Sequence, residues 1–426
     1  MILKLTIGIR TKPSLTVIVV SSVLLICGCS AQKEPVRTAL SGYIDRGEVP
    51  GLVFLVSHHG KVRVEAIGKK GFGQNEAMKR DCVFRIASMT KPIVAVATMI
   101  LVEDGKLELD EPVERLMPEL SRRKVLKRLD GPLQETVLAK RPITVRDLLT
   151  FRAGHGLLFF EPGGNFEQFP IQKAIRTLGL ENGPPLPRLK YKPDEWMRRF
   201  GTLPLMHQPG EEWMYHTAYE ILGVLIARAS GQPLETFLQK RIFEPLGMKD
   251  TGFTISPENL SRLAPQYGLD PKTGQRSQID GVEDSQWKHT PLFPSGGGGL
   301  ASTIDDYLAF AHMLLNKGEY NGKRILSRSS IELMTTDQIS AEQRAKSQFH
   351  FFPNFWNHYG WGFGVSVLTK PHEGAQPGRY GWDGGYGTTW FNDSHDALTG
   401  ILMTQVSVNF KMFDDFRKAV YETVSR

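Results

Sequence analysis

Segments typical of β-strands lie at both ends of this chain, and the stretch between them is mainly helical in pattern. Near the N-terminus, residues 51–57 and 62–66 are apolar runs separated by a turn at His59-Gly60, which predicts a hairpin. The later predicted elements are strands over residues 362–367, 379–382, 388–391 and 398–406 and a helix over residues 413–424. This order predicts an α/β fold of the α+β type: a mainly antiparallel sheet built from both chain ends and flanked by helices, with an inserted, mainly helical lobe.

The sheet and the helices divide the chain into two lobes of one domain over residues 39–426. We assign residues 39–92 and 291–426 to the sheet lobe and residues 93–290 to the helical lobe. With 41% hydrophobic and 23% charged residues, the composition is ordinary for a globular protein with a large core. Residues 156–209 are rich in proline and aromatic residues, and we expect this long connection to form a lid and a wall of an acyl pocket.

The N-terminal segment is typical of an export signal. A basic start without acidic residues precedes an apolar stretch over residues 15–26, which is too short to span a bilayer comfortably. The stretch ends in Ile-Cys-Gly-Cys-Ser at residues 26–30, a motif that resembles a bacterial lipobox with Cys29 as the lipidated residue. We therefore expect residues 1–28 to be a lipoprotein signal peptide and residues 29–38 to be a tether.

An ordinary signal peptide or an uncleaved anchor also fits the apolar stretch. The lipobox resemblance favours lipidation, and Ser30 directly after Cys29 resembles the pattern of outer-membrane retention in Gram-negative bacteria. The predicted protein is therefore an exported lipoprotein that touches the membrane only through its N-terminal lipid and faces the periplasm.

Charge and cysteine content exclude several kinds of partner. The net charge is +7, three of the positive charges lie in the signal segment, and the remainder are evenly spread, which argues against nucleic acid. After cleavage and lipidation only Cys82 keeps a thiol, so we expect no disulfide within the chain. No H-E-x-x-H motif occurs, and the adjacent His58 and His59 would point to opposite strand faces, so we expect neither a metal nor another cofactor.

The segment around Ser88 has the local features of a nucleophilic serine. An apolar run of strand type, residues 83–87, leads into it, and a long apolar segment, residues 93–102, follows with an expected stop at Gly105. Lys91 comes three residues after the serine, and positions i and i+3 of a helix share a face, so its amine is able to lie beside the hydroxyl. The serine would then lie at a helix N-terminus, where backbone N–H groups favour developing negative charge.

Local context leaves two interpretations of Ser88 and Lys91 open: a catalytic pair, or a helix cap with a lysine nearby. Three other Ser-x-x-Lys matches lie in polar surroundings without a buried helix after them, and we interpret them as surface residues. These matches begin at Ser30, Ser121 and Ser285. Two distant segments favour the catalytic interpretation of Ser88.

The first of these segments is Trp-Met-Tyr-His-Thr at residues 213–217, before an apolar helical stretch at residues 221–226. Thr217 and Glu220 have the spacing of a capping box, which predicts that Tyr215 lies on the loop just before the helix. A phenol held near the lysine is suited to exchange protons with the serine and the leaving group, although a tyrosine packed at a helix entry has the same pattern.

The second segment is Tyr-Gly-Trp-Asp-Gly-Gly-Tyr-Gly-Thr at residues 380–388. Its glycines permit close approach of a ligand to the backbone, so that a backbone N–H group here would stabilise an oxyanion together with the N–H group of Ser88. A β-bulge or a hairpin turn is the structural alternative.

Two further features lie near these segments in the sequence. His216, next to Tyr215, either tunes the site or holds the substrate, or it lies on an exposed loop, and we favour the exposed loop. The glycine run at residues 296–299 is not followed by the Lys-Ser/Thr of a P-loop, so we interpret it as a tight turn near the floor of the site. Thr303 and Asp306 have the pattern of a helix N-cap.

Taken in this order and spacing, the motifs resemble the serine β-lactamase-related family, which includes class C β-lactamases, DD-peptidases and the family VIII carboxylesterases. The resemblance covers about residues 40–426. Its ordered segments are residues 84–91, 209–217, 231–251, 296–315 and 382–387. It implies that Ser88 is the acylated nucleophile, Lys91 its base and Tyr215 a proton shuttle, with the N–H groups of Ser88 and Gly385 as the oxyanion hole.

Two departures from the family pattern bear on the substrate. Thr217 stands where β-lactamases usually have Asn, and Trp382, followed by Asp383 and Gly384, stands where they have the Lys of a Lys-Thr-Gly motif. The resemblance places Thr217, Trp382 and Gly384 in the substrate-binding site. A literal Lys-Thr-Gly at residues 272–274 lies too early in the chain and is interpreted as a surface turn. Whether Asp383 is catalytic, electrostatic or a turn residue stays open.

An aromatic residue at position 382 resembles the family VIII esterases and favours ester over β-lactam hydrolysis. We therefore predict a serine hydrolase that forms an acyl-serine intermediate, most simply a carboxylesterase acting on short-chain esters. The alternative is a D-amino-acid peptidase of the DD-peptidase type or a weak β-lactamase, so the expected partner is a small-molecule ester or amide. A binding module without catalytic activity is disfavoured because Ser88, Lys91 and Tyr215 are all present. The sequence contains no G-x-S-x-G motif, which argues against an α/β-hydrolase. The oligomeric state stays open.

Overall fold

A computed structural model describes most of the chain. The described residues are 34–158, 169–180, 189–270, 273–347, 349, 352, 354–407 and 409–425. The predicted signal peptide, Cys29 and the first part of the predicted tether lie outside these residues. Within the described part, none of the helices is both long enough and apolar enough to span a membrane.

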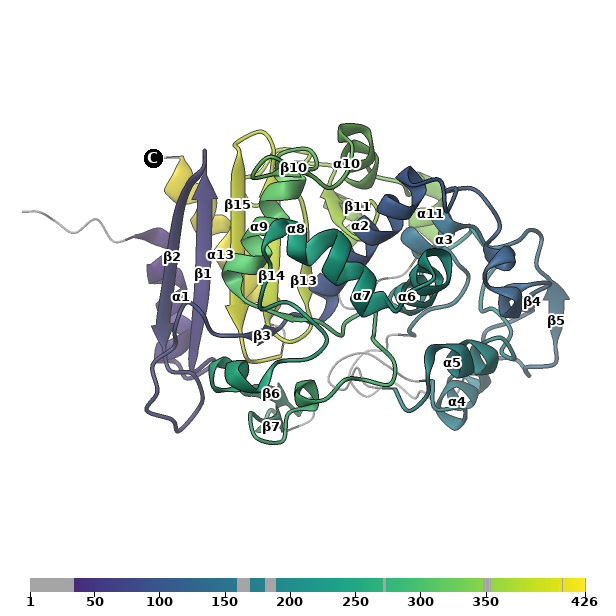
Figure 1. Cartoon of the computed structure of the whole chain (residues 1–426), viewed down its shortest axis with the longest axis horizontal. Helices are drawn as coiled ribbons and strands as arrows, with labels where there is room; N and C mark the ends of the chain where they lie inside the picture. Colours follow the sequence, from purple (N-terminus) through teal and green to yellow (C-terminus); the bar gives the residue numbers. More distant parts are fainter. Residues whose placement is uncertain are drawn as a thin grey trace, which may run out of the picture.

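A central antiparallel sheet joins the two ends of the chain (Figure 1). Its strand order is β11-β12-β13-β14-β15-β1-β2, with β1 (Gly51–His58) and β2 (Lys61–Gly68) from the N-terminal side. The strands from the C-terminal side are β11 (Tyr359–Trp361), β12 (Ser366–Leu368), β13 (Tyr380–Gly384), β14 (Thr388–Asp393) and β15 (Leu398–Thr404). The antiparallel pairing of β1 with β15 joins the N-terminal and C-terminal strands into one sheet. The predicted fold class is thereby confirmed.

One predicted strand is wrong in its position. Residues 362–365 form the tight connection between β11 and β12, and only the end of the predicted strand 362–367 enters β12. Gly364 has a φ of 77°, and a Cβ at Gly362 would collide with the carbonyl oxygen of Met334. The glycines therefore serve the turn and not a continuous strand.

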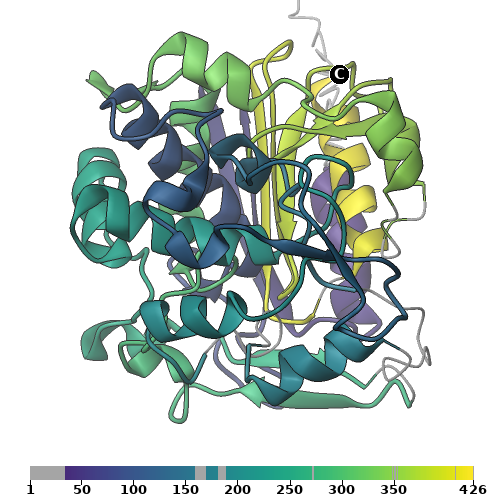
Figure 2. The same cartoon turned by 90° about the vertical axis from the view of Figure 1, so that its right-hand side faces the viewer.

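Helices cover both faces of the sheet. Successive side chains of a strand point to opposite faces, and here the residues on both faces are apolar and need to be buried. On one face, Leu52 and Phe54 of β1 pack with α1 (Pro35–Asp45) and α13 (Phe410–Val424). Figure 2 shows these two helices together on one side of the strands. On the other face, Val53 packs in the core that includes α2 (Thr90–Glu103) and α9 (Ile304–Leu315). Helix α1 begins at Pro35, within the residues 29–38 of the predicted tether.

Short elements complete the structure around these layers. The remaining helices are α3 (Val145–Leu149), α4 (Pro170–Thr177), α5 (Pro193–Phe200), α6 (Thr217–Ser230), α7 (Leu234–Leu238), α8 (Glu244–Leu246), α10 (Arg328–Met334), α11 (Ala341–Lys346) and α12 (Phe355–His358). Small two-stranded sheets are made by β3 (Phe84–Arg85) with β8 (Ala301–Ser302), β4 (Lys124–Leu126) with β5 (Thr136–Leu138), β6 (Gln266–Leu269) with β7 (Arg276–Asp280) and β9 (Glu319–Tyr320) with β10 (Lys323–Arg324). In the predicted lid segment, residues 156–209, the described parts contain α4 and α5.

Helix α2 is the rigid element that carries the candidate nucleophile. Residues 90–101 are all buried, as expected for a helix that is apolar on every side. The helix ends at Glu103, and Gly105 follows with a φ of 66°, which confirms the predicted stop. The literal Lys-Thr-Gly motif lies far from this helix in sequence: Thr273 and Gly274 are exposed between β6 and β7, and Lys272 is outside the described residues.

Candidate active site

Ser88 lies in a 3-10 turn, Ala87–Met89, between β3 and α2, so the predicted strand–serine–helix arrangement is present. Its side chain is buried, with 5% of the residue exposed. Ala87 has a φ of 43°, an uncommon conformation for a residue with a side chain. The sharp bend at Ala87 aims the following residue away from the strand, and such bends concentrate at functional sites.

Lys91 contacts Ser88 directly. Its Nζ lies 2.9 Å from Ser88 Oγ and donates to the Gly297 carbonyl oxygen at 2.5 Å. The amine also lies 3.2 Å from His216 Nδ1 and 4.5 Å from the centroid of the Tyr215 ring. Complete burial lowers the pKa of Lys91 from 10.5 to about 7, although the charge of Glu220 partly opposes this shift. A neutral amine beside a hydroxyl is able to remove its proton.

Tyr215 also contacts Ser88. Its hydroxyl forms side-chain hydrogen bonds with Ser88 and with Trp382, whose Nε1 donates at 2.7 Å. The backbone carbonyl of Tyr215 accepts from the N–H group of Leu157, and its ring packs against Phe151. Burial raises the pKa of Tyr215 above its ordinary value of 10.0, while the hydrogen bonds with Ser88 and Trp382 partly offset this effect. The phenol therefore stays protonated near neutral pH and is suited to donate a proton.

The end of β13 lies against the backbone that precedes Ser88. A Cβ at Gly384 would collide with the carbonyl oxygen of Ile86, so only glycine permits this approach. Thr388 Oγ1, at the start of β14, also donates to Ile86 at 3.3 Å. Gly385 is the first residue of the turn between β13 and β14, so the turn that carries its N–H group lies next to the serine segment.

The predicted capping box at Thr217 and Glu220 is wrong. His216 is the N-cap residue of α6, and the buried Thr217 is the first residue of the helix. The Glu220 carboxylate accepts from Ser295 Oγ at 2.6 Å and from the N–H group of Gly297 at 3.2 Å. The glycine run therefore forms a turn at the floor of the site, as predicted. The Glu220 carboxylate, which the sequence pattern assigned to the start of α6, is hydrogen-bonded to this turn instead.

His216 is a functional candidate that the preferred sequence interpretation missed. It is fully buried, not exposed, and its backbone has a φ of 85°. Burial, followed by the positive charge of Lys91, lowers the pKa of His216, so the imidazole is neutral. Its Nε2 lies 3.3 Å from Glu220 Oε1. The only sequence signal for this role was its position next to Tyr215.

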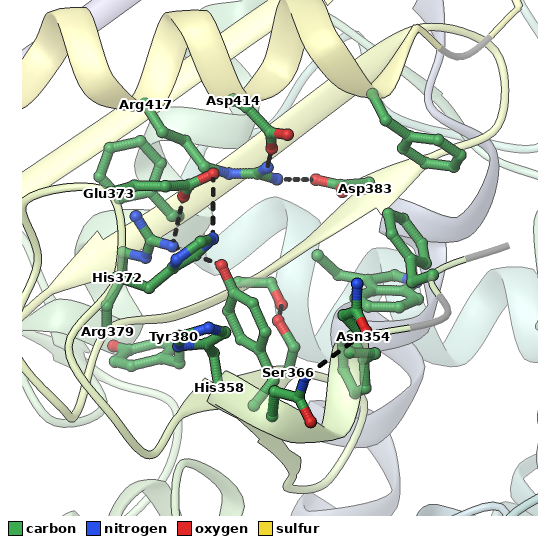
Figure 3. A pocket seen from close by; sticks show the side chains of 18 of the residues that line it. Asn354, His358, Ser366, His372, Glu373, Arg379, Tyr380, Asp383, Asp414 and Arg417 are labelled. Atoms are coloured by element: carbon green, nitrogen blue, oxygen red, sulfur yellow. Dashed lines mark hydrogen bonds and ion pairs between the residues drawn. The ribbon is translucent and has the colours of Figure 1, made fainter. Parts of the chain in front are cut away.

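Asp383 lies on the opposite face of β13 from Trp382, as expected from the alternation of side chains along a strand. Its carboxylate accepts from Thr389 Oγ1 and from the guanidinium of Arg417 on α13, and Figure 3 shows this ion pair. Asp383 therefore holds β13 to α13, and its negative charge adds to the effect of burial in raising the pKa of Tyr215.

A cavity of about 490 Å³ lies beside this ion pair (Figure 3). Its lining residues come from the C-terminal part of the chain and include Trp382, Glu373 and Arg417, but not Ser88 or Lys91. Part of its wall is made by Phe352, Asn354 and Phe355. The cavity is therefore separate from the serine, with Trp382 as the residue common to both.

Among the described residues, no group of three or more histidine, cysteine or carboxylate side chains is arranged to hold a metal ion. The thiol of Cys82 is buried, and burial raises its pKa. The groups with unusual proton affinity in the site are Lys91, Tyr215 and His216.

Comparison with known proteins places this arrangement in a family. A family model described as Beta-lactamase matches residues 36–422. Protein Rv1367c of Mycobacterium tuberculosis is 39% identical over 369 residues, which cover 85% of this chain and 87% of that protein. Esterase EstB of Burkholderia gladioli is 31% identical over 382 residues, which cover 84% of this chain and 86% of that protein.

The fold agrees with these matches. The solved structure of EstCE1, a hydrolase with promiscuous acyltransferase activity, has a TM-score of 0.72 at 25% identity, covering 91% of this chain and 97% of that one. The family resemblance predicted from the ordered motifs is thereby confirmed. This chain belongs to the Beta-lactamase family, and within it the chain is a serine hydrolase with esterase relatives.

Proposed function

We propose that this enzyme is a carboxylesterase that cleaves small-molecule esters with short acyl chains through an acyl-enzyme on Ser88. The observation that carries the proposal is the contact of a buried amine, Lys91 Nζ, with Ser88 Oγ at 2.9 Å. Because the pKa of Lys91 is lowered to about 7, a large fraction of the amine is neutral at physiological pH and accepts the serine proton.

In acylation, Lys91 takes the hydroxyl proton while Ser88 Oγ forms a bond with the ester carbonyl carbon. The backbone N–H groups of Ser88 and Gly385 donate to the oxyanion that develops on the carbonyl oxygen. The proton then passes from Lys91 through the hydroxyl of Tyr215 to the alkoxy oxygen as the carbon–oxygen bond breaks, and the alcohol leaves. Tyr215 is suited to this transfer because its hydroxyl is protonated and hydrogen-bonded to the serine.

Deacylation repeats these steps with water as the nucleophile. Water attacks the acyl carbon of the Ser88 ester, and its proton passes through Tyr215 and Lys91 to the departing Oγ. The products are the carboxylic acid and the free serine. Thr217, Trp382 and Gly384 are proposed to line the substrate site around these atoms.

The environment of Trp382 favours an ester over a carboxylated β-lactam or peptide. The indole N–H group donates to Tyr215 and offers no positive charge to a substrate carboxylate. A charged hydrogen bond of the kind that a lysine would supply is worth about 1.5–3 kcal/mol, so its loss weakens binding of such substrates. The esterase named among the relatives also supports an ester substrate.

The proposal is tested by comparing wild type with Ser88→Ala on a series of p-nitrophenyl esters and on a chromogenic cephalosporin. We expect fastest turnover on the shortest acyl chains, little cephalosporin cleavage, and no activity above background in Ser88→Ala. Dominant cephalosporin or D-amino-acid peptide cleavage would favour the β-lactamase or DD-peptidase alternative. Ester turnover that persists in Ser88→Ala would contradict the assignment of the nucleophile.

We also propose that the enzyme is exported and anchored to the outer membrane through a lipid on Cys29. The support is the lipobox resemblance at residues 26–30. Metabolic labelling with a palmitate analogue is expected to mark the wild-type protein and to leave Cys29→Ala unlabelled. Labelling that is equal in both proteins, or absent from both, would contradict the anchor.

A further inference from the structure

Three polar atoms surround Lys91 Nζ, which is enough to satisfy either an ammonium or a neutral amine. Nζ lies 2.9 Å from Ser88 Oγ, 3.2 Å from His216 Nδ1 and 2.5 Å from the carbonyl oxygen of Gly297. A neutral amine has two N–H bonds and one lone pair, whereas an ammonium has three N–H bonds and no lone pair. The Gly297 carbonyl is only able to accept, so it takes one N–H bond in either state.

The tautomer of His216 decides how the rest of this capacity is used. If Nδ1 is unprotonated, it accepts the second N–H bond of Lys91, and the lone pair is left for the hydroxyl proton of Ser88. If Nδ1 carries the proton, it donates to the lone pair, and Lys91 is then unable to act as a base towards the serine.

Glu220 favours the productive tautomer. Its Oε1 lies 3.3 Å from His216 Nε2, and an ionised carboxylate only accepts, which favours a proton on Nε2. The two atoms are not well aligned as a hydrogen bond, so the carboxylate acts mainly through its negative charge. Ser295 Oγ and the N–H group of Gly297 fix the carboxylate in place, and Glu220 is completely buried.

Two features of the backbone show how closely the packing fits this arrangement. His216 adopts φ 85° and ψ −67°, a conformation that few residues with side chains adopt. A Cβ at Gly297 would collide with Glu220 Oε1, so glycine is required where one residue supplies both the carbonyl for Lys91 and the N–H group for Glu220.

We infer that Glu220 and His216 are positioning residues: Glu220, through His216, directs the lone pair of Lys91 to Ser88. This inference rests on the proposed function of Ser88. The ionisable groups that face the amine are Tyr215 and His216, from the segment before α6, and Glu220, from α6 itself. Asp383 is bound to Arg417 on the far face of β13.

The test measures kcat and KM for a short-chain p-nitrophenyl ester from about pH 5 to about pH 9, across the range in which Lys91 titrates. The proteins are wild type, Glu220→Gln, His216→Gly, His216→Asn and a matched control, Glu244→Gln, whose side chain is exposed on α8. The same samples are labelled with a fluorophosphonate and analysed by intact mass, which reports the reactivity of Ser88 independently of ester turnover.

We expect Glu220→Gln to move the midpoint of the acid limb of kcat/KM down by about one pH unit, because a negative charge that favours the ammonium is removed. His216→Gly relieves the positive φ and removes the Nδ1 acceptor, so we expect kcat to fall on the order of 10²-fold with KM little changed. His216→Asn, which keeps an acceptor oxygen and tolerates positive φ, is expected to recover part of the loss. Glu244→Gln is expected to match wild type.

Each result decides between a positioning role and a structural one. If His216→Gly and Glu220→Gln keep the midpoint and kcat of wild type, the inference is overturned, whatever their thermal stability. If Glu220→Gln does not fold, the comparison of His216→Asn with His216→Gly decides: equal loss in both overturns the inference. A wild-type protein that takes no label at Ser88 would instead refute the proposed function on which the inference rests.

Discussion

Two neighbouring residues of β13 point to opposite faces of the strand, and a buried cation near each face has its pKa shifted in the opposite direction. On one face, Trp382 donates to Tyr215 near the amine of Lys91. On the other face, Asp383 forms an ion pair with Arg417. Lys91 is completely buried and the Arg417 side chain is only 12% exposed, so burial alone does not distinguish the two.

The difference lies in the partners of each cation. In the described part of the chain, Lys91 contacts a hydroxyl, an imidazole and a carbonyl but no carboxylate, and its pKa falls to about 7. Burial by itself lowers the pKa of Arg417 as well, but Asp383 and Glu373 outweigh this effect and raise it. One face of the strand therefore holds an amine that exchanges protons, and the other holds a guanidinium that stays charged and joins β13 to α13.

The largest expected effect comes from removing the amine on the catalytic face. Lys91→Ala is expected to lower kcat/KM for a short-chain ester by about 10²–10⁴-fold, since the serine loses its base. Lys91→Arg is the matched variant, because a guanidinium stays charged and is unable to accept the proton. Steady-state kinetics with a thermal-unfolding control check both. Near-full activity of Lys91→Ala at neutral pH would show that Lys91 is not the base.

On the charged face we expect a loss of stability with little loss of activity. Arg417→Met leaves Asp383 without its cation, while Glu373 keeps its ion pair with Arg379. Breaking a buried pair in this way typically costs about 3–5 kcal/mol of unfolding free energy. Chemical denaturation measures this cost, and ester kinetics on the folded fraction measure activity. A fall in kcat without a fall in stability would mean that the two faces are coupled, contrary to this account.

The smallest expected effect is at Trp382, on the catalytic face. Trp382→Phe removes the indole donor from the Tyr215 hydroxyl while keeping an aromatic ring. One neutral hydrogen bond is worth about 1 kcal/mol, so we expect kcat/KM for esters to fall about fivefold. Cephalosporin cleavage is expected to stay low, because no positive charge is introduced. A large gain in cephalosporin cleavage would show that the indole ring, and not the missing charge, excludes that substrate.

Much of the site could be predicted from the sequence because its parts carry local signals. Ser88 and Lys91 are three residues apart at the start of an apolar helix, so the local helix geometry already brings them together. The glycines around Trp382 mark a strand that approaches another backbone closely. Alternation along β13 also places Asp383 on the face away from Trp382, although this step needs the strand register.

His216 and Glu220 could not be placed in the same way. The spacing of Thr217 and Glu220 is the same whether the carboxylate caps the helix or turns into the core, and only the positive φ of His216 and the approach of Gly297 decide between the two. The prediction of a strand over residues 362–367 failed for a similar reason. In a sequence pattern, a glycine with positive φ in a turn, such as Gly364, looks the same as a glycine within a strand. The positions of His216, Glu220 and this turn depend on tertiary packing, which a local sequence pattern does not contain.

The most direct test of the central claim is the pH dependence of Ser88 acylation, followed by intact mass with a slowly released acylating ester. Lys91 is a base only when neutral. The acylation rate of wild type is therefore expected to be low at acid pH, where the amine is an ammonium, and to increase with pH through a single ionisation near pH 7. The raised pKa of Tyr215 predicts no second loss just above neutrality. In Lys91→Ala the rise near pH 7 is expected to disappear. A wild-type rate that is independent of pH across this range, or an adduct on a residue other than Ser88, would contradict the account.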